Sequence, residues 1–371
     1  MAQAKEIVTK LLATADVQIN GSRPWDIQVH NDGLYVRVLS GGSLALGESY
    51  MDGWWDCKEL DQFFEKILDA HIDRKILGFK HLILPYIKAK LFNRQKTHAY
   101  NIGEKHYDIG NALYTRMLDK NMQYSCGYWK NAQTLDKAQE DKLNLICKKL
   151  QLKKGDRLLD IGCGWGTLLR YAVKKYGITG VGITVSQEQA KLAREKCAGL
   201  PIDIRVQDYR TVNEKFDKIV SVGMIEHVGW KNYRTYMGVV HRCLKDDGIF
   251  LLHTIGANKT STGPGDPWVD KYIFPDGRLP SVEQVAIASN GLFIMEDWHN
   301  FAVDYSKTLM AWRANFRQAW PELKKDYDER FYRMWNYYLS CFAGGFRVRI
   351  NQLWQIVYTK HGLKGGYESV R

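Results

Sequence analysis

From about residue 134 the chain alternates short apolar runs with amphipathic segments. Residues 134–151 place Leu, Ile and Ala side chains near the 3.6-residue period of a helix, and residues 157–161 form an apolar run of strand length. The same alternation predicts strands at 179–183, 202–206, 217–222 and 248–254, and helices at 167–176, 187–197 and 232–244. Strands and helices that alternate at this spacing predict an α/β domain with a mostly parallel, doubly wound sheet.

The N-terminal third has a less regular pattern. Residues 1–20 predict a helix and then the start of a strand, and residues 58–70 have helical periodicity. Turn signals separate short β-like runs at 27–29 and 34–38. We therefore expect a smaller, mainly helical region ahead of the α/β domain.

Polar and turn residues interrupt the pattern between residues 95 and 125, and we place the domain boundary there. The prediction is an N-terminal domain over 1–120 and an α/β domain over 121–371. At about 100–200 residues per domain, a chain of this length fits two domains.

Composition and charge narrow the class of protein. With 45% apolar and 25% charged residues the chain is globular in composition, and it lacks the run of about 18 apolar residues that spans a membrane. The N-terminus has neither the apolar core nor the cleavage site of a secretory leader. The 53 Lys and Arg against 41 Asp and Glu give a net charge of +12, which favours an anionic partner: nucleic acid, an acidic small molecule or an anionic membrane surface.

The seven cysteines are scattered, odd in number and nowhere spaced as C-x-x-C. This pattern favours reduced thiols in the cytoplasm and excludes a disulfide-stabilised secreted scaffold. It also argues against a cysteine zinc site, so we expect no bound metal.

The sharpest local motif is LLDIGCGWG at 158–166, directly after a predicted strand and before a predicted helix. Gly162, Gly164 and Gly166 allow a tight turn and close approach of a ligand to the backbone. The spacing G-x-G-x-G departs from the dinucleotide fingerprint G-x-G-x-x-G, so NAD is the weaker match. With Asp160 two residues ahead of the glycines, the motif resembles the S-adenosylmethionine (SAM) motif of class I methyltransferases. A plain glycine turn is the alternative interpretation.

Polar residues also follow the next two predicted strands. Thr184 and Gln189 are candidates for the ribose hydroxyl groups of the cofactor, and Asp208 and Tyr209 for the edge and face of adenine. Each pair is equally compatible with ordinary loop residues.

Several longer segments together resemble the cyclopropane and mycolic acid cyclopropane synthase family, and they span almost the entire chain. They are GESYMDGWW (47–55), HYDIGNALY (106–114), MQYSCGYW (122–129), LLDIGCGWG (158–166), GITVSQEQ (182–189), IVSVGMIEHVG (219–229), LLHTIG (251–256), NFAVDYSKTLMAW (300–312) and CFAGGFRVRINQLWQ (341–355). The first segment is similar to the N-terminal domain of the phospholipid-acting bacterial members, which implies a phospholipid substrate. The fold implied is the Rossmann-like domain of a class I SAM-dependent methyltransferase.

The reaction that this resemblance implies is methylene transfer. The cis double bond of an unsaturated acyl chain attacks the SAM methyl group, a carbocation forms, one proton leaves and the cyclopropane ring closes. The proton acceptor implied is a bound bicarbonate ion. The residues carried over to its cradle are Cys126, Glu226, His253, Ile255 and Tyr305.

Three further positions match family site residues. Tyr124 and Ser125 match positions at the edge of the cofactor, and Cys341 matches a cysteine assigned to the active site. Methyl transfer to an alkene needs no cysteine nucleophile, so a chemical role for Cys341 is not expected.

The same residues have structural interpretations when the resemblance is set aside. Glu226 then fits an acid at the start of a helix, and His253 fits a hydrogen-bonded core histidine. Tyr305 and Cys126 then fit ordinary core side chains.

The double bond of such a substrate lies within the bilayer. A protein without a spanning helix must therefore bind the membrane surface to reach it. Residues 72–98 interleave basic with apolar side chains and are the candidate segment for an anionic membrane surface. The alternative is a core helix with a solvated basic face. The resemblance thus implies a cytoplasmic protein held at the inner face of the membrane, with 1–120 on the lipid side, and avidity favours a homodimer.

Two other functions remain open. A nucleic-acid methyltransferase would explain the charge and the glycine motif, but the chain has no Asn-Pro-Pro-Tyr run, and we expect no nucleic-acid partner. A related lipid methyltransferase would use the same site and give a methyl branch in place of a ring.

Overall fold

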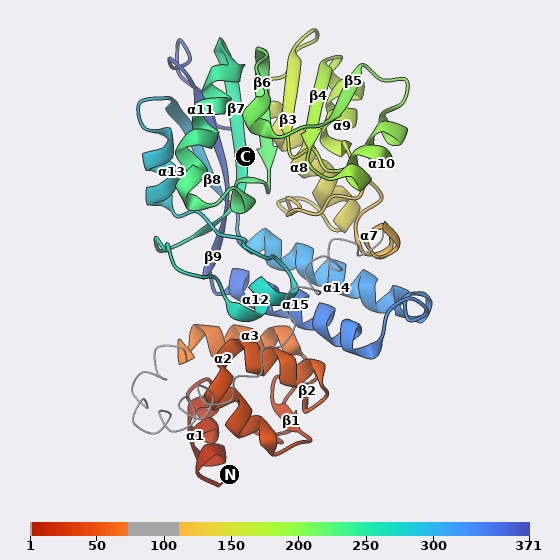
Figure 1. The fold of residues 1–371 in the computed structure, drawn as a ribbon, viewed down its shortest axis with the longest axis vertical. Coiled ribbons are helices and arrows are strands. Elements are labelled where there is room, and N and C mark those ends of the chain that lie inside the picture. Colours follow the sequence, from red (N-terminus) through yellow and green to blue (C-terminus); the bar gives the residue numbers. More distant parts are fainter. Residues whose placement is uncertain (1, 73–110) are drawn as a thin grey trace. The chain divides into compact units, whose positions relative to one another are not determined.

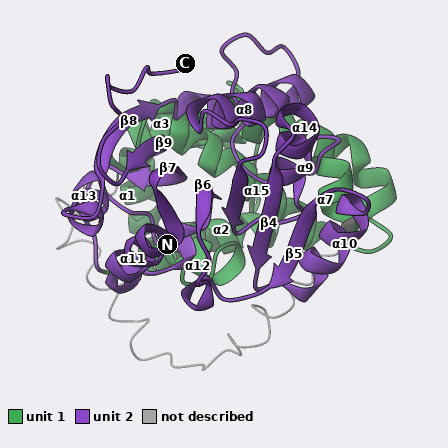
Figure 2. Cartoon of the chain, turned by 90° about the horizontal axis from the view of Figure 1, so that it is seen from above, with its two compact units in different colours: residues 1–117, 263–276, 306–350 green, residues 118–262, 277–305, 351–371 purple. Residues whose placement is uncertain are grey.

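The computed structural model describes residues 2–72 and 111–371 and divides into two compact units, which Figure 2 colours separately. Unit 1 comprises Met1–Met117, Gly263–Asp276 and Ser306–Ile350, and unit 2 comprises Leu118–Thr262, Gly277–Tyr305 and Asn351–Arg371. The candidate membrane segment, apart from its first residue, and the first half of the 106–114 motif lie outside the described residues. The first break in the chain falls close to the predicted boundary, but two later segments return to unit 1. The units therefore differ from two consecutive domains.

Unit 1 is mainly helical, as predicted (Figure 1). Its helices are α1 (Ala2–Ala13), α2 (Gly33–Met51), α3 (Leu60–Asp69), α7 (Asn111–Met117), α12 (Pro267–Tyr272), α15 (Glu329–Arg347) and α14 (Val303–Leu323) from Ser306 onward. A short antiparallel pair joins β1 (Ile27–Val29) to β2 (Trp55–Cys57). Helix α15 packs closely on α3. A Cβ atom on Gly344 would lie only 2.8 Å from the backbone nitrogen of Glu65, so the close approach requires glycine here.

The predicted β-like run at 34–38 is wrong, because these residues lie in helix α2. Tyr35 and Leu39, four residues apart, are both buried on this helix. Helical spacing of the buried side chains therefore outweighs the strand preference of Val36 and Val38.

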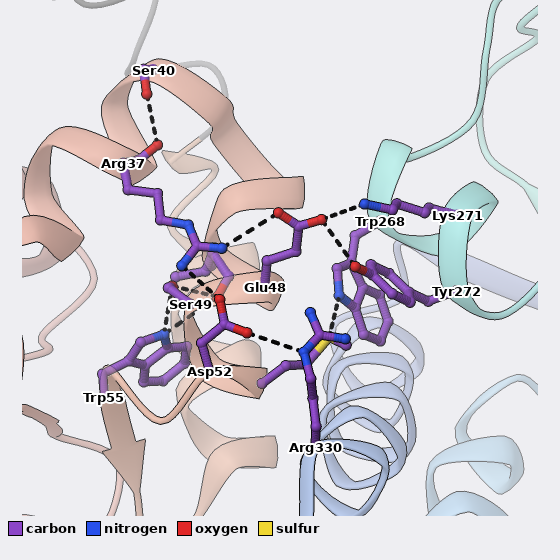
Figure 3. A network of polar contacts seen from close by, with 12 residues as sticks. Arg37, Ser40, Glu48, Ser49, Asp52, Trp55, Trp268, Lys271, Tyr272 and Arg330 are labelled. Atoms are coloured by element: carbon purple, nitrogen blue, oxygen red, sulfur yellow. Dashed lines mark hydrogen bonds and ion pairs between the residues drawn. The ribbon is translucent and has the colours of Figure 1, made fainter. Parts of the chain in front are cut away.

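A polar network joins three helices within unit 1 (Figure 3). Glu48 of α2 accepts hydrogen bonds from Lys271 at 2.7 Å and from the Tyr272 hydroxyl at 3.0 Å, both in α12. Asp52 lies between Arg37, at 2.8 Å, and Arg330 of α15, at 3.1 Å. These ion pairs hold the later segments of the chain to the N-terminal helices.

Unit 2 contains a seven-stranded sheet with the order β5-β4-β3-β6-β7-β9-β8. Its elements are α8 (Leu135–Lys149), β3 (Arg157–Ile161), α9 (Thr167–Tyr176), β4 (Thr179–Thr184), α10 (Gln187–Cys197), β5 (Ile202–Val206), β6 (Phe216–Val222), α11 (Tyr233–Cys243), β7 (Leu244–Ala257), α13 (Val282–Ser289), β8 (Ile294–Asn300) and β9 (Asn351–Thr359). The first five strands along this order are parallel, and β9 is antiparallel to β7 and β8. The predicted doubly wound α/β fold is confirmed.

Helices cover both faces of this sheet (Figure 1), and alternation along the strands sorts the side chains onto these two faces. Leu158 packs in a core with residues of α8, α9 and α10, whereas Leu159 and Ile161 pack in a core with residues of α11 and α13. Asp160 therefore faces the α8 side. In β7 the same alternation places His253 on that side, because Leu251 packs in the α8 core.

No helix among the described residues is both long and apolar enough to cross a bilayer. All seven cysteines lie in the described part of the chain, and none forms a disulfide there.

Candidate functional site

The glycine motif forms the turn between β3 and α9. Gly162, Gly164 and Gly166 have φ angles of 85°, 52° and 73°, a region that favours glycine. A Cβ atom on Gly166 would lie 2.8 Å from Sγ of Cys197, whereas one on Gly164 would have no atom within 4 Å. Packing against Cys197 thus requires glycine at position 166, whereas the space beside the backbone of Gly164 is open to a ligand.

Asp160, at the end of β3, is buried beside a buried lysine of α8. Burial raises the pKa of Asp160 to about 7, and the charge of Lys142 opposes this rise. Nζ of Lys142 donates a hydrogen bond to Oγ of Ser125 at 2.7 Å, and Gln139 donates one to the Ser125 carbonyl at 2.8 Å. Helix α8 therefore holds two predicted cofactor residues, Ser125 and Asp160, to one buried cation.

The candidates after β4 and β5 have partners of their own. The hydroxyl group of Thr184 lies 3.1 Å from the amide oxygen of Gln189, so these two predicted residues form a pair. Asp208 accepts hydrogen bonds from the Arg210 guanidinium at 2.6 Å and from its backbone nitrogen at 2.9 Å. Tyr209 follows in a short 3-10 turn with its ring half-buried. A cofactor ring bound by Asp208 would therefore compete with Arg210.

Glu226 is buried and lies in a 3-10 turn, Ile225–His227, shortly after β6. Its Oε1 accepts a hydrogen bond from the backbone nitrogen of Ile255 at 2.8 Å. Its Oε2 is buried and has no hydrogen-bond partner among the described residues. Burial raises the pKa of Glu226 to about 7, so both protonation states are populated near neutral pH.

His253, in β7, is almost fully buried and lies next to the end of β6, because it pairs with Val222. Its Nδ1 lies 3.2 Å from the amide nitrogen of Gln355, and its Nε2 has no partner among the described residues. Burial lowers the pKa of His253 well below its usual range, and the charge of Lys142 adds to this effect. The ring is therefore neutral.

The ring of Phe301 connects His253 to the segment that contains Cys126. It lies 6.0 Å from the His253 ring and 5.3 Å from the Tyr128 ring, edge to face in both cases. Cys126, two residues before Tyr128, is fully buried. The structure thus brings this segment together with His253.

Tyr305 is buried in the first turn of α14. The preceding residue, Asp304, accepts a hydrogen bond from the backbone nitrogen of Trp129 at 2.7 Å, which ties the start of α14 to the Cys126 segment. Cys341 instead lies on α15 in unit 1, and burial raises the pKa of its thiol. A raised pKa lowers the fraction of thiolate, which is the nucleophilic form of cysteine.

Sequence reasoning missed two residues of this cluster, Lys142 and Gln355. Lys142 lies at helical spacing from Ala138 and Ile146 on the buried stripe of α8. A lysine at helical spacing among apolar residues is a signal in the sequence for a buried charge. No local pattern in the sequence marks Gln355, because its role depends on the pairing of β9 with β7.

Comparison with known proteins gives a consistent result. The profile of the family described as mycolic acid cyclopropane synthetase matches residues 94–356. The chain is 54% identical to the cyclopropane-fatty-acyl-phospholipid synthase of Escherichia coli K12 over 366 residues, 98% of this chain and 95% of the relative. It is 31% identical to the tuberculostearic acid methyltransferase UfaA1 of Mycobacterium tuberculosis over 354 residues, 89% of this chain and 82% of the relative.

Two solved structures have the same fold. The mycolic acid cyclopropane synthase CmaA1 complexed with SAH and CTAB has a TM-score of 0.65 and 31% identity, covering 72% of this chain and all (100%) of that one. The cyclopropane synthase MmaA2 from Mycobacterium tuberculosis has a TM-score of 0.65 and 29% identity with the same coverage. The likeness to the Escherichia coli protein covers 98% of this chain, whereas these structures cover 72% of it.

Proposed function

The chain belongs to the mycolic acid cyclopropane synthetase family, and from that premise we propose that it transfers a methylene group from SAM to the cis double bond of an unsaturated phospholipid acyl chain. One observation carries the proposal: the 54% identity with a phospholipid-acting relative spans 98% of this chain. The glycine turn offers an accessible backbone for the cofactor. The buried Glu226–His253 region offers polar groups that can hold the proton acceptor.

The β3–α9 turn suits SAM. Its open backbone at Gly164 permits close approach, and the buried carboxylate of Asp160 suits the cationic methionine end of this molecule. Thr184 ends the adjacent strand and Gln189 lies in the first turn of α10, where the ribose of a cofactor binds in doubly wound sheets. When bound, SAM supplies the carbon that closes the ring.

The Glu226–His253 region suits a small hydrogen-bonding anion. Oε2 of Glu226 and Nε2 of His253 are buried polar atoms without partners among the described residues, and a buried orphan of this kind costs about 1–3 kcal/mol. A bicarbonate ion offers both a donor and acceptors, and when bound it supplies the base for the departing proton. Cys126, Ile255 and Tyr305 complete the proposed cradle: Cys126 and Tyr305 are buried, and the backbone nitrogen of Ile255 donates to Glu226.

The membrane context is a further part of the proposal. The net charge of +12 and the basic, apolar segment 72–98 support binding of the N-terminal region to an anionic membrane surface from the cytoplasmic side. A homodimer would add avidity on that surface. Vesicle binding tests this part separately from chemistry.

A second candidate is a lipid methyltransferase that gives a methyl branch. The observation that favours it is the 31% identity with a tuberculostearic acid methyltransferase. Expression in a bacterial host lacking cyclopropane synthesis, followed by mass spectrometry of its fatty acids, distinguishes the two. A product one CH2 heavier, with fragmentation that shows a ring, supports our proposal. A branched product, or unchanged fatty acids, overturns it.

A further inference from the structure

Gln355 and His253 form a buried side-chain pair across two antiparallel strands. Their Cα atoms are register partners in β9 and β7, so both side chains stand on the same face of the sheet. Both residues are essentially fully buried. The amide nitrogen of Gln355 lies 3.2 Å from Nδ1 of His253.

This contact decides which ring nitrogen of His253 carries the proton. In this orientation of the Gln355 amide its nitrogen donates, so Nδ1 accepts and is unprotonated, while the amide oxygen, which is also buried, has no partner among the described residues. A neutral imidazole then has its single hydrogen on Nε2. That nitrogen is the one without a partner among the described residues, so it is left as a donor for a bound ligand.

We propose that Gln355 is a positioning residue that fixes His253 in the Nε2-protonated tautomer and aims this donor at the proposed bicarbonate ion. The inference rests on the proposed function only for the identity of that ion. The tautomer follows from this orientation of the Gln355 amide, and the reverse orientation, with Nδ1–H donating to the amide oxygen, is the outcome that overturns the proposal.

The neighbouring titratable groups among the described residues do not replace Gln355 as the partner of Nδ1 of His253. The titratable groups that act on His253 are Lys142 and Lys149 of α8 and His299 of β8, and all of them oppose a positive charge on its ring. His299 pairs with Gln355 from the opposite strand, but its Nδ1 is bound to Lys149 at 3.1 Å. Gln355 is the residue that the described structure places in hydrogen-bond contact with Nδ1 of His253.

The test uses nitrogen-15 histidine labelling of the full-length protein and NMR of the imidazole nitrogens. The resonances of His253, one of ten histidines, are identified by their loss in His253→Gln. We expect protonated Nε2 and unprotonated Nδ1 in the wild-type protein. In Gln355→Glu the carboxylate accepts from Nδ1, so the proton moves there and the pKa of His253 rises by about 1–3 units. Gln355→Met removes the contact, and both tautomers should be populated.

Gln352→Met is the matched control, because Gln352 lies on the same strand and is bonded to Asn300 at 2.8 Å, away from His253. It should leave the His253 tautomer unchanged. We expect kcat for lipid methylenation to fall by about 10²-fold in Gln355→Glu, with the KM for SAM within about twofold. A wild-type Nδ1–H tautomer, or a His253 signal unchanged by Gln355→Glu, overturns the proposal. The expected NMR result with unaltered kcat would keep the tautomer assignment and instead contradict the role of His253 in the reaction.

Discussion

Nζ of Lys142 donates a hydrogen bond to Oγ of Ser125 over 2.7 Å, although only 2% of this lysine is exposed. Burial lowers the pKa of Lys142 to about 8, and the negative charges of Asp119 and Asp160 partly offset this effect. The same burial raises the pKa of Asp160 to about 7. The two charges therefore support each other in the interior.

Replacing Lys142 by methionine should weaken SAM binding. Loss of the ammonium group removes the charge that lowers the pKa of Asp160, so this carboxyl is protonated over a wider pH range. Calorimetric titration with SAM, without lipid, should show a Kd raised about tenfold at neutral pH, the cost of one charged hydrogen bond. The deficit should shrink as the pH rises and Asp160 ionises. Lys148→Met, an equal charge change at an exposed position of α8, is the control, and equal Kd values in both variants would contradict the pairing.

Two glycines of the β3–α9 turn should respond differently to alanine. Gly164→Ala meets no atom within 4 Å, so the fold bears only the backbone cost of about 1–2 kcal/mol, and the main effect should be weaker SAM binding. Gly166→Ala bears a similar backbone cost and also places a methyl group 2.8 Å from Sγ of Cys197, which should lower the melting temperature further. Thermal unfolding and SAM titration on both variants check this contrast. Equal losses of stability would refute it.

Glu226→Gln should strongly reduce turnover and spare the cofactor site. The glutamine keeps the shape of the side chain but cannot exchange a proton, so the rate of lipid methylenation should fall by about 10²-fold or more while SAM binds normally. Product is measured by gas chromatography of the fatty acids, with exposed Glu195→Gln as the control. Near-normal product from Glu226→Gln would remove this residue from the mechanism.

The same substitution should change how stability depends on pH. Burial raises the pKa of Glu226 to about 7 in the folded protein, above its ordinary value of 4.5, so the folded state keeps this proton to a higher pH than the unfolded state. Wild-type stability should therefore fall as the pH rises between these two values, and the contribution from this group should be absent in Glu226→Gln. Denaturant titrations at several pH values compare the two slopes. Identical slopes would contradict the raised pKa.

Cys341→Ala should retain most of the activity. The thiol lies on α15 with a pKa raised by burial, so it supplies no thiolate near neutral pH. Turnover should stay within about tenfold of wild type, a loss smaller than general acid–base residues produce. A loss as large as that of Glu226→Gln, in a variant with normal thermal stability, would give this cysteine a chemical role.

Charge reversal in the candidate membrane segment should weaken vesicle binding. Lys88, Lys90 and Arg94 each contribute about 1 kcal/mol near an anionic surface, so changing all three to Glu should lower sedimentation with phosphatidylglycerol vesicles by more than tenfold. Binding to zwitterionic vesicles should change little. The control reverses the exposed residues Lys148, Lys153 and Lys154. Equal sedimentation of both variants would show that net charge, and not this segment, governs binding.

Where the hydrophobic pattern was regular, the sequence predicted the elements closely. Strand β3 and helices α9 and α10 have the predicted bounds, because each combines a clear period with glycine or capping signals at its ends. The run at 34–38 predicts a strand, whereas the structure places it in helix α2, where Tyr35 and Leu39 are buried at helical spacing. Local preference yields there to burial in the folded unit.

The site was predictable where it depends on strand ends and unpredictable where it depends on pairing between distant segments. Glu226 and His253 follow from the positions of β6 and β7 together with the family resemblance. The contact of His253 with Gln355 bridges 102 residues and requires a strand that runs against its neighbours. Segments 263–276 and 306–350 likewise join unit 1 through contacts that no local pattern encodes.

Strand β9 lies between β7 and β8, although it is the last described strand to leave the ribosome. Unit 1 also waits for residues up to Ile350 before all its segments exist. Neither unit can therefore follow the usual order in which an N-terminal domain folds during synthesis. The nascent chain exposes the unpaired edge of β7 until β9 has been synthesised, and an exposed edge of this kind is a template for aggregation. Expression yield should accordingly depend on chaperone capacity and translation rate more strongly than for an enzyme with consecutive domains.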